Sequence, residues 1–355
     1  MFDKLEIKSE KLGRENEDRW NDLLNISVYG SYAVSMTYEY IKTDDGREIS
    51  TYIFQLGGED IAGAHYSFKR SHSNLISTAD ILSGFLFKEE LNQDIFSFLI
   101  SHFLDWAREK KASYVRIIPW IPKTIKGQEA NFAVMFENAF MQSGFISVMP
   151  GKHTYWLDLR LTEETLLAKM KSKTRYNIRL GAKSGIDIEE LNEVDHDIVD
   201  EFWRLYAELG EKKAFYILTE SRFKNEVVSL VESGLANLFV AKYKGQIINI
   251  SLASNSGRAS FMYGAMNPVF KNLEGCTSPG PISHWEMIRT MKQKNNKTYD
   301  LGFTPGPVPY KEHPSFDMWR FKHGFGGEHV EFMPTYGKRL SPIRGRIFHY
   351  LKYKK

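Results

Sequence analysis

The chain has 355 residues, of which 42% are hydrophobic, 14% aromatic and 26% charged, with a formal net charge of +3. This length favours two domains, the composition excludes a disordered chain, and a single cysteine, Cys276, excludes an intramolecular disulfide or a cysteine-based metal cluster. No apolar run approaches the roughly 20 residues that span a bilayer, and the charged segment 1–10 does not resemble a signal peptide, so we expect a cytoplasmic protein.

The first half of the chain predicts a hairpin, a helix, a strand and a second helix. Residues 52–64 have the pattern of two strands joined by a glycine turn. An amphipathic helix with a basic end is predicted at 101–111, and the apolar run 114–118 predicts a buried strand. A second helix is expected to end at Gly144.

Residues 161–186 predict one helix with a basic face. Thr162 is suited to cap its amino end, and Gly185 can adopt the left-handed conformation that ends a helix. One face is apolar, whereas the other carries five basic side chains: Lys169, Lys173, Arg175, Arg179 and Lys183. No acid lies between Ala168 and Ser184, although a solvated helix face normally mixes charges of both signs. The pattern indicates a phosphate-bearing partner, and the alternative is a face balanced by acids from elsewhere in the fold.

The second half repeats the order of the first. A hairpin is predicted at 238–250, a basic-ended helix at 283–294, a strand at 299–303 and a helix ending at Gly324. Pairing Ile61 with Ile247, Tyr114 with Tyr299 and Gly144 with Gly324 gives offsets of 186, 185 and 180. Offsets this constant indicate a duplicated domain.

The repeated order predicts α/β domains with mixed sheets and is that of the GNAT acyltransferase fold, although other α+β domains share it. We therefore expect tandem GNAT-like domains. The first would comprise residues 1–153, closed by the C-terminal segment 331–355. The second would comprise residues 154–330 and carry the basic helix.

The tail at 338–355 contains seven basic residues and no acid. Its apolar side chains have the spacing of a helix face: Ile343, Ile347, Phe348 and Leu351. One interpretation is peripheral contact with the inner face of the plasma membrane. The other is a closing strand and helix that pack back on the first domain.

Several segments together resemble the Fem family of aminoacyltransferases. Residues 171–186 form a Lys/Arg-rich helix containing Arg-x-Asn-Ile-Arg, which is similar to the family's signature. Similar segments follow in the family's order before and after it, at 154–159, 261–265, 285–288, 299–302 and 321–327. The resemblance covers about residues 20–337 and implies twin GNAT-like domains of the compact type, without a coiled-coil arm.

The resemblance implies transfer of an amino acid from aminoacyl-tRNA to the stem-peptide amine of a peptidoglycan precursor, either nucleotide-linked or lipid-linked. It implies no cofactor and no metal. An aminoacyl ester is already activated, so positioning and oxyanion stabilisation can supply most of the catalysis. The sequence fits this chemistry, because it contains no Gly-x-Ser-x-Gly elbow, no Walker loop and no His-Glu-x-x-His motif.

Three residues are implied to act in catalysis. Lys322 matches a lysine that the family uses near the reacting ester, and Phe321 would stack on the terminal adenine of the tRNA. Tyr263 matches an active-site tyrosine. The alternative for Lys322 is that it and Arg320 are solvent-exposed charges on the helix before Gly324.

Two residues are implied to bind the acceptor. Lys42 lies where the family places a lysine that contacts precursor phosphate. The family's Arg-x-x-x-Tyr after the basic helix is replaced here by Leu218 and Arg222, and we expect Arg222 to supply the missing positive charge from one turn away. The acidic residue that often precedes Pro in the first domain is Ile118, so the identity of the acceptor stays open.

Two other functions remain alternatives. A CoA-dependent GNAT N-acyltransferase acting on an envelope precursor would need an Arg/Gln-x-x-Gly-x-Gly/Ala loop for the pyrophosphate, which neither half contains. A non-catalytic RNA-binding protein would bind charged and uncharged tRNA alike.

Overall fold

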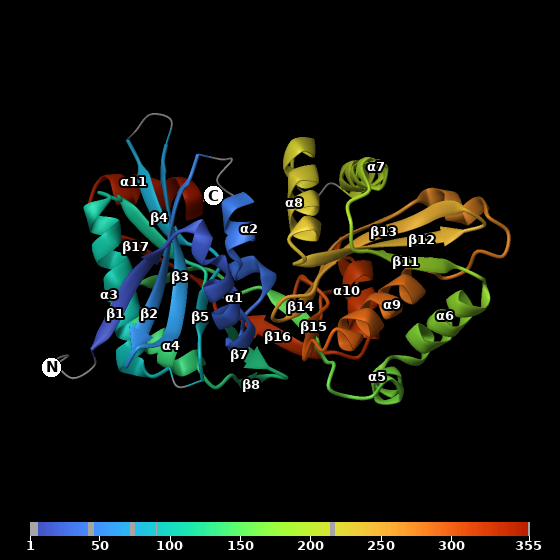
Figure 1. Ribbon diagram of the computed structural model, residues 1–355, viewed down its shortest axis with the longest axis horizontal. Helices are drawn as coiled ribbons and strands as arrows, with labels where there is room; N and C mark the ends of the chain where they lie inside the picture. The colour runs from blue at the N-terminus through green and yellow to red at the C-terminus, as the bar shows by residue number, and fades with distance from the viewer. Residues whose placement is uncertain (1–5, 42–45, 72–74, 90, 214–216, 354–355) are drawn as a thin grey trace. The chain divides into compact units, whose positions relative to one another are not determined.

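The computed structural model describes residues 6–41, 46–71, 75–89, 91–213 and 217–353. The chain divides into two compact units, unit 1 with Met1–His153 and Val330–Lys355, and unit 2 with Thr154–His329. Each unit contains a mixed β-sheet with helices on its faces (Figure 1). None of the described helices combines the length and the apolar character that crossing a membrane requires.

The sheet of unit 1 has the order β1-β2-β3-β4-β6-β17-β9, and only β4 and β6 are parallel. The strands are β1 (Ile7–Leu12), β2 (Glu48–Leu56), β3 (Glu59–Arg70), β4 (Ser77–Ile81), β6 (Tyr114–Ile117), β9 (Ile146–Met149) and β17 (Thr335–Arg339), with β5 (Phe85–Phe87) paired to β3. The short strands β7 (Pro122–Ile125) and β8 (Gln128–Glu129) form a hairpin, and β7 also pairs with the end of β16 (Glu328–Phe332), from Val330 to Phe332. The helices are α1 (Glu17–Ile26), α2 (Met36–Ile41), α3 (Gln93–Glu109), α4 (Ala133–Gln142) and α11 (Arg344–Tyr353).

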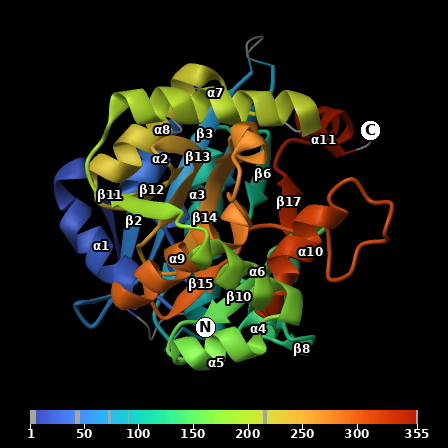
Figure 2. The same cartoon turned by 90° about the vertical axis from the view of Figure 1, so that its right-hand side faces the viewer.

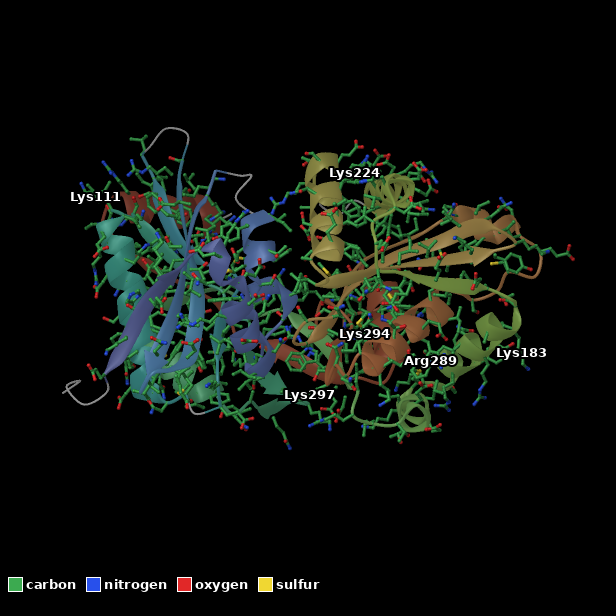
Figure 3. The ribbon with its side chains drawn as sticks, in the orientation of Figure 1. Lys111, Lys183, Lys224, Arg289, Lys294 and Lys297 are labelled. Carbon is green, nitrogen blue, oxygen red and sulfur yellow. The ribbon has the colours of Figure 1, made fainter. Side chains whose placement is uncertain are left out.

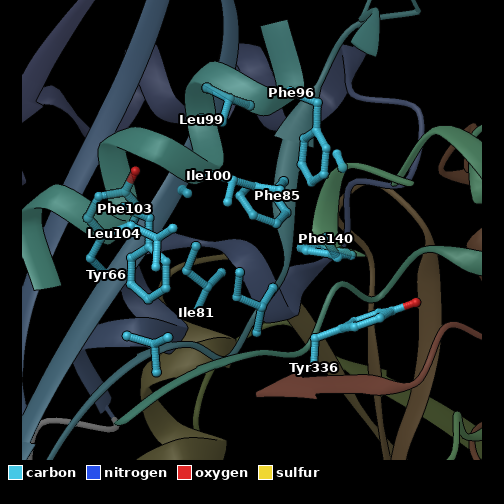
Figure 4. Packing of buried hydrophobic residues seen from close by; sticks show 14 of the residues in the cluster. Tyr66, Ile81, Phe85, Phe96, Leu99, Ile100, Phe103, Leu104, Phe140 and Tyr336 are labelled. Carbon is cyan, nitrogen blue, oxygen red and sulfur yellow. The ribbon is translucent and has the colours of Figure 1, made fainter. Parts of the chain in front are cut away.

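Aromatic side chains fill the core of unit 1 between the sheet and helices α3 and α4 (Figure 4). Phe96 of α3 packs on the rings of α4, and Phe140 of α4 stacks on Tyr336 of β17. Helix α3 begins well before residue 101, the start predicted from the sequence. The Asn92 side chain caps it by accepting hydrogen bonds from the backbone amides of Asp94 and Ile95.

The sheet of unit 2 has the order β11-β12-β13-β14-β15-β10-β16. Its strands are β10 (His153–Asp158), β11 (Asp187–Leu191), β12 (Ala236–Tyr243), β13 (Gln246–Ser254), β14 (Ala259–Met266), β15 (Thr298–Asp300) and β16 (Glu328–Phe332), the last of which ends in unit 1. The helices are α5 (Glu163–Lys169), α6 (Ser172–Lys183), α7 (His196–Lys213), α8 (Glu220–Glu232), α9 (Pro279–Gln293) and α10 (Phe316–Gly324). Helices α7 and α8 cover one face of the sheet, and α9 and α10 lie on the other (Figure 1).

The predicted duplication is present in the order of the elements. The first repeat runs β1-α1-α2-β2-β3-β4-α3-β6-α4-β9, and the second runs β11-α7-α8-β12-β13-β14-α9-β15-α10-β16. The strand that follows each repeat along the chain lies in the sheet of the other repeat. Strand β10 follows the first repeat but joins the sheet of unit 2, whereas β17 follows the second and joins the sheet of unit 1.

The segment predicted as one basic helix forms two helices, α5 and α6, so that prediction was wrong at its centre. Met170 has an extended backbone and a buried side chain. The Lys171 amide donates to the carbonyl of Gly324 on α10 at 2.9 Å, instead of continuing the helix. This tertiary contact outweighs the helical propensity of the segment. Gly185 follows α6 with the predicted left-handed conformation, at φ +76°.

The C-terminal tail packs on unit 1 as strand β17 and helix α11, in agreement with the second interpretation above. Phe348, predicted to lie on a free apolar face, instead contacts the ring of Tyr114 on β6 at 4.7 Å. The remaining predicted apolar side chains, Ile343, Ile347 and Leu351, are exposed.

Candidate active site

Lys322 is a buried lysine on α10 and is only 7% exposed. Its Nζ donates to the carbonyl oxygen of Phe303 at 2.9 Å and lies 5.8 Å from the centre of the Phe261 ring. An ammonium has three N–H donors, and this is its one hydrogen bond within the described part of the chain. By contrast, Arg320 is exposed and pairs with Asp317 at 2.9 Å. The alternative that both are solvated charges is therefore wrong for Lys322.

A turn after β15 places the Phe303 carbonyl on the lysine. The carboxylate of Asp300 accepts hydrogen bonds from the Gly302 amide at 2.8 Å and from the Trp156 indole at 3.0 Å. Gly302 has φ +78°, which disfavours other residues, and a Cβ there would lie 3.0 Å from the lysine Nζ. The strand predicted at 299–303 is shorter for this reason, and it ends at Asp300.

Burial controls the protonation of two neighbouring groups on this side of the sheet. Burial lowers the pKa of Lys322 to about 8, while the nearby carboxylate of Asp300 acts in the opposite direction. Burial and the positive charge of Lys322 lower the pKa of His284 to about 3, so this imidazole is neutral at physiological pH. Its Nε2 is buried and has no hydrogen-bond partner within the described residues. The site therefore holds a lysine close to its titration point beside a neutral histidine.

The lysine lies where two parallel strands stop pairing. Strands β14 and β15 pair only at Ala259–Tyr299 and Ser260–Asp300. Phe261, next along β14, has its ring near the Lys322 ammonium. Diverging carboxyl ends of parallel strands are a usual place for ligands in open α/β sheets.

Aromatic side chains surround the lysine on α10. Phe321 is half-buried and meets the rings of His284 and Phe325 edge-on, at 5.6 and 5.2 Å. The long loop between β15 and α10 lies beside α10 (Figure 2), where the indole of Trp319 donates to the carbonyl of Pro307 at 2.8 Å. The ring of Phe321 is thus partly exposed to solvent next to the lysine.

Helix α6 packs directly on the helix that carries Lys322. The Lys171 amide bonds the Gly324 carbonyl, and a Cβ at Gly324 would collide with the hydroxyl of Thr174. Four of the predicted basic residues are exposed and form no ion pair with any described residue: Lys169, Lys173, Arg179 and Lys183. Lys183 lies at the carboxyl end of α6 (Figure 3). Acids elsewhere in the described fold thus form no ion pair with these four side chains.

Arg175 differs from the other members of the stripe. Its guanidinium donates to the carbonyls of Ala168 and Met170, which end α5 and have no helical partner. It is half-buried and closes the break between the two helices. The prediction that Arg175 binds tRNA stays a prediction, and its guanidinium already donates to two backbone carbonyls.

Tyr263 and Arg222 lie on the opposite side of the sheet from Lys322. A register irregularity opposite Leu252 lets Phe261 and Tyr263 of β14 face different helices. The Tyr263 hydroxyl donates to Glu226 of α8 at 2.8 Å. Arg222 lies one turn before Glu226, and its buried Nε has no hydrogen-bond partner among the described residues. Tyr263 of β14 therefore contacts α8, the helix that carries Arg222, and neither residue contacts Lys322.

One predicted site residue cannot be placed, and several residues around Lys322 were not predicted from the sequence. Lys42 lies outside the described residues. His284 and the Phe303 carbonyl were missed, because a histidine inside a helix and a backbone oxygen carry no sequence signature. Asp300 and Gly302 were inside the matched segment 299–302, but nothing in the pattern assigned them the turn that holds the lysine.

The described residues contain no group of three or more His, Cys, Asp or Glu side chains that could hold a metal ion. Burial raises the pKa of the Cys276 thiol, so the nucleophilic thiolate is scarce near neutral pH.

Comparison with known proteins identifies the fold. Residues 168–312 match a family described as "Acetyltransferase (GNAT) domain". The crystal structure of FemX matches with a TM-score of 0.82 at 16% identity, covering 98% of this chain and 100% of that chain. A tandem GNAT protein from the clavulanic acid biosynthesis pathway matches with a TM-score of 0.54 at 13% identity, covering 95% and 99%. L-PGS from Bacillus licheniformis matches with a TM-score of 0.54 at 13% identity, covering 98% and 99%. No curated protein matches the sequence.

These likenesses confirm the predicted fold class, tandem GNAT-like α/β domains, and the resemblance to the Fem family at the level of the fold. At such low identities a shared fold does not transfer a substrate. Together with the GNAT match they support an acyltransferase.

Proposed function

We propose that this chain is an aminoacyltransferase that moves an amino acid from aminoacyl-tRNA to the stem-peptide amine of a peptidoglycan precursor. The observation that carries the proposal is the contact between α10, which holds the buried Lys322, and α6, which holds an unpaired basic surface. A polyphosphate donor with a reactive ester at its end needs both features side by side.

In the proposed reaction, the acceptor amine attacks the ester carbonyl and forms a new C–N bond. The C–O bond to the terminal ribose breaks, and the proton lost by the amine is taken up by the leaving hydroxyl. Negative charge develops on the carbonyl oxygen in the tetrahedral intermediate. The Lys322 ammonium, with two donors beyond its bond to Phe303, offsets that charge in a site shielded from water.

Phe321 and the basic surface complete the donor site in this proposal. Phe321 presents a partly accessible ring next to the lysine, and an aromatic ring is a stacking platform for a terminal base. The exposed residues Lys169, Lys173, Arg179 and Lys183 bind backbone phosphates without sequence preference.

Arg222 and Tyr263 are proposed to bind a part of the acceptor that is remote from its amine, because they lie on the opposite side of the sheet from Lys322. The guanidinium of Arg222 is suited to a phosphate or carboxylate, and Tyr263 is held by Glu226 one turn along α8. Arg222→Ala should raise the Michaelis constant for the acceptor several-fold and leave that for the donor unchanged in steady-state assays. Lys224→Ala, which removes a cation of the same helix paired with Asp200 and Glu220, is the control. An unchanged acceptor constant in Arg222→Ala would remove this residue from the site.

An acyl-CoA donor is the second candidate, because the matched family is described as an acetyltransferase domain. Helix amino ends bind a pyrophosphate through free backbone amides. Helix α9 has Pro279 and Pro281 in its first turn, and prolines have no N–H to donate. At the equivalent helix of unit 1, Asn92 already accepts from the amides of Asp94 and Ile95. These two helix ends favour the aminoacyl-tRNA donor over CoA.

The test incubates the protein with a panel of radiolabelled aminoacyl-tRNAs and with nucleotide-linked and lipid-linked precursors, then measures label in the muropeptide. We expect transfer that ribonuclease abolishes and that acyl-CoA does not replace. Transfer from acyl-CoA without RNA would refute the proposal in favour of the second candidate. Binding of charged and uncharged tRNA without any transfer would indicate a non-catalytic RNA-binding protein.

A further inference from the structure

Helix α11 has one face that is fixed to unit 1. Phe348 packs on Tyr114, and the Tyr114 hydroxyl forms a hydrogen bond with Nδ1 of His349 at 3.1 Å. Tyr353 lies 6.3 Å from the same tyrosine ring. These contacts set the rotation of the helix about its axis.

The opposite face of α11 is apolar and exposed. Its side chains Ile347, Tyr350 and Leu351 are 47%, 63% and 59% exposed, and Ile343, directly before the helix, is 74% exposed. Their spacing of four, seven and eight residues from Ile343 places them on one arc of about 100° on a helix. Isolated exposed apolar residues are ordinary, whereas four on one arc form a patch that favours a partner.

Basic residues border this apolar arc on both sides. At about 100° per residue, Arg344 falls beside Leu351 on one side of the arc and Arg346 falls beside Tyr350 on the other. Both arginines are exposed and form no ion pair with a described residue. No acidic residue occurs in the sequence from Lys338 to Lys355, so this segment contributes only positive charge to the surface.

We propose that this face of α11 docks on an anionic lipid surface. An apolar stripe between two cationic borders has the layout of a helix that lies in the plane of a membrane interface. There the apolar side chains enter the acyl boundary while the arginines reach lipid phosphates. Pairing with a second copy of the helix would bring four arginines together, and their repulsion favours lipid over self-association.

This docking surface is independent of the catalytic proposal, because it lies in unit 1 and involves no residue of the candidate active site. Its consequence is a concentration of the protein at membranes that carry lipid-linked substrates. The surface therefore bears on which precursor form the protein meets, whatever reaction it performs.

The full-length protein is mixed with vesicles of phosphatidylcholine alone, or with equal parts of phosphatidylcholine and phosphatidylglycerol, and binding is measured by flotation at low and high salt. We expect binding to the anionic vesicles only, weaker at high salt because the charges are screened. The double variant Arg344→Gln, Arg346→Gln should bind about fivefold more weakly for each arginine removed. The double variant Ile347→Ser, Leu351→Ser should also lose most of the binding.

The matched controls remove the same chemistry elsewhere in unit 1. Ile26→Ser with Val134→Ser removes two exposed apolar side chains, and Lys11→Gln with Lys123→Gln removes two exposed charges. Both should bind as the parent protein does, and thermal unfolding verifies that all variants are folded. No binding to anionic vesicles, or equal losses in the control variants, would overturn the proposal. So would a dimer in sedimentation experiments that Ile347→Ser, Leu351→Ser dissociates without any vesicle binding.

Discussion

Lys322 combines features that a buried lysine rarely keeps without a function. Removing an ammonium from water is unfavourable, and burial has already lowered its pKa to about 8. One carbonyl oxygen accepts a single hydrogen bond from it, while the nearby Asp300 carboxylate is occupied by Gly302, Trp156 and Thr154. A strongly perturbed lysine at the point where two parallel strands stop pairing is therefore a functional candidate on physical grounds.

Replacing Lys322 should affect the chemical step more than binding. Lys322→Ala should lower the turnover number on the order of a hundredfold, because it removes stabilisation of the developing oxyanion, while the affinity for aminoacyl-tRNA changes little. Lys322→Arg should restore activity only in part, since a planar guanidinium directs its donors differently. Single-turnover transfer and filter binding measure the two effects separately.

Arg320→Ala provides the control for Lys322, because it removes an exposed charge from the same helix. Its turnover should stay close to that of the parent. Equal losses in the two alanine variants would mean that charge in this region matters in general and that Lys322 has no special role.

The pH dependence should report the same lysine. If the ammonium is the working form, turnover falls as pH rises through about 8. The folded-state pKa lies below the ordinary value of 10.5, so the burial penalty is fully present below pH 8 and is relieved between pH 8 and 10.5. Stability from this group thus increases across the window in which activity falls.

Comparing the pH dependence of kcat in the parent and in Lys322→Arg separates the titration of Lys322 from that of the acceptor amine. The amine titrates in the same way with both proteins. The descending limb near pH 8 should be absent in Lys322→Arg, since a guanidinium keeps its proton. A parent profile that rises through pH 8 relative to the variant would show that the neutral amine acts, as a base.

Among the helices and strands, the sequence predicted the features that depend on neighbouring residues, such as helix spacing and helix caps. The apolar spacing and the cap at Thr162 predicted a helix, and the Thr162 side chain does cap α5 by accepting from the Thr165 amide. The break at Met170 was invisible in the sequence, because it depends on a hydrogen bond to Gly324, more than a hundred residues away. The same limit applies to the role of Arg175, which follows from that break.

Helix α6 should contribute to RNA affinity through release of counterions. Replacing Lys173, Arg179 and Lys183 with Gln should reduce the salt dependence of tRNA binding by about two in the slope of log K against log salt. The matched control replaces Lys11, Lys111 and Lys123, three exposed lysines of unit 1, and should leave the slope unchanged.

Arg175→Gln separates structure from binding on the same helix. It should lower the melting temperature, because two carbonyls at the end of α5 lose their donor, and it should change the salt slope less than the triple variant does. Calorimetry and the same binding titrations check both. An unchanged slope in the triple variant would mean that the exposed lysines of α6 are only a solvated face.

At the scale of the whole chain, the repeat was readable from sequence because equivalent elements keep their spacing. The repeat offsets alone do not predict the exchange of the closing strands β10 and β17, which follow equivalent strands of the two repeats. We expected the segment 331–355 to close the first domain, and β17 joins the sheet of unit 1. Which sheet a strand enters depends on contacts between distant residues, which no local pattern encodes.

The exchange makes the folding of unit 1 depend on the last residues of the chain. Strand β17 is an interior strand, paired with β6 on one side and β9 on the other, and its Tyr336 is buried against Phe140 at a ring distance of 4.3 Å. A chain that ends after residue 329 should therefore lose the cooperative unfolding transition of unit 1, because two strands would lose their ladder partner and the core would lose an aromatic side chain.

In the full-length chain, Tyr336→Ala should destabilise unit 1 by about 3 kcal/mol or more. Tyr350→Ala, at an exposed tyrosine of α11, should cost little. Urea titrations followed by hydrogen exchange assign each transition to a unit, and protection in unit 2 should survive both variants, because β10 is supplied by the chain before it.

Joining residues 330–355 to residue 153 through a flexible linker should restore a folded unit 1, whereas residues 1–153 alone should not fold. If residues 1–153 fold cooperatively without the last segment, β17 is an accessory to that sheet and the exchange has no consequence for folding.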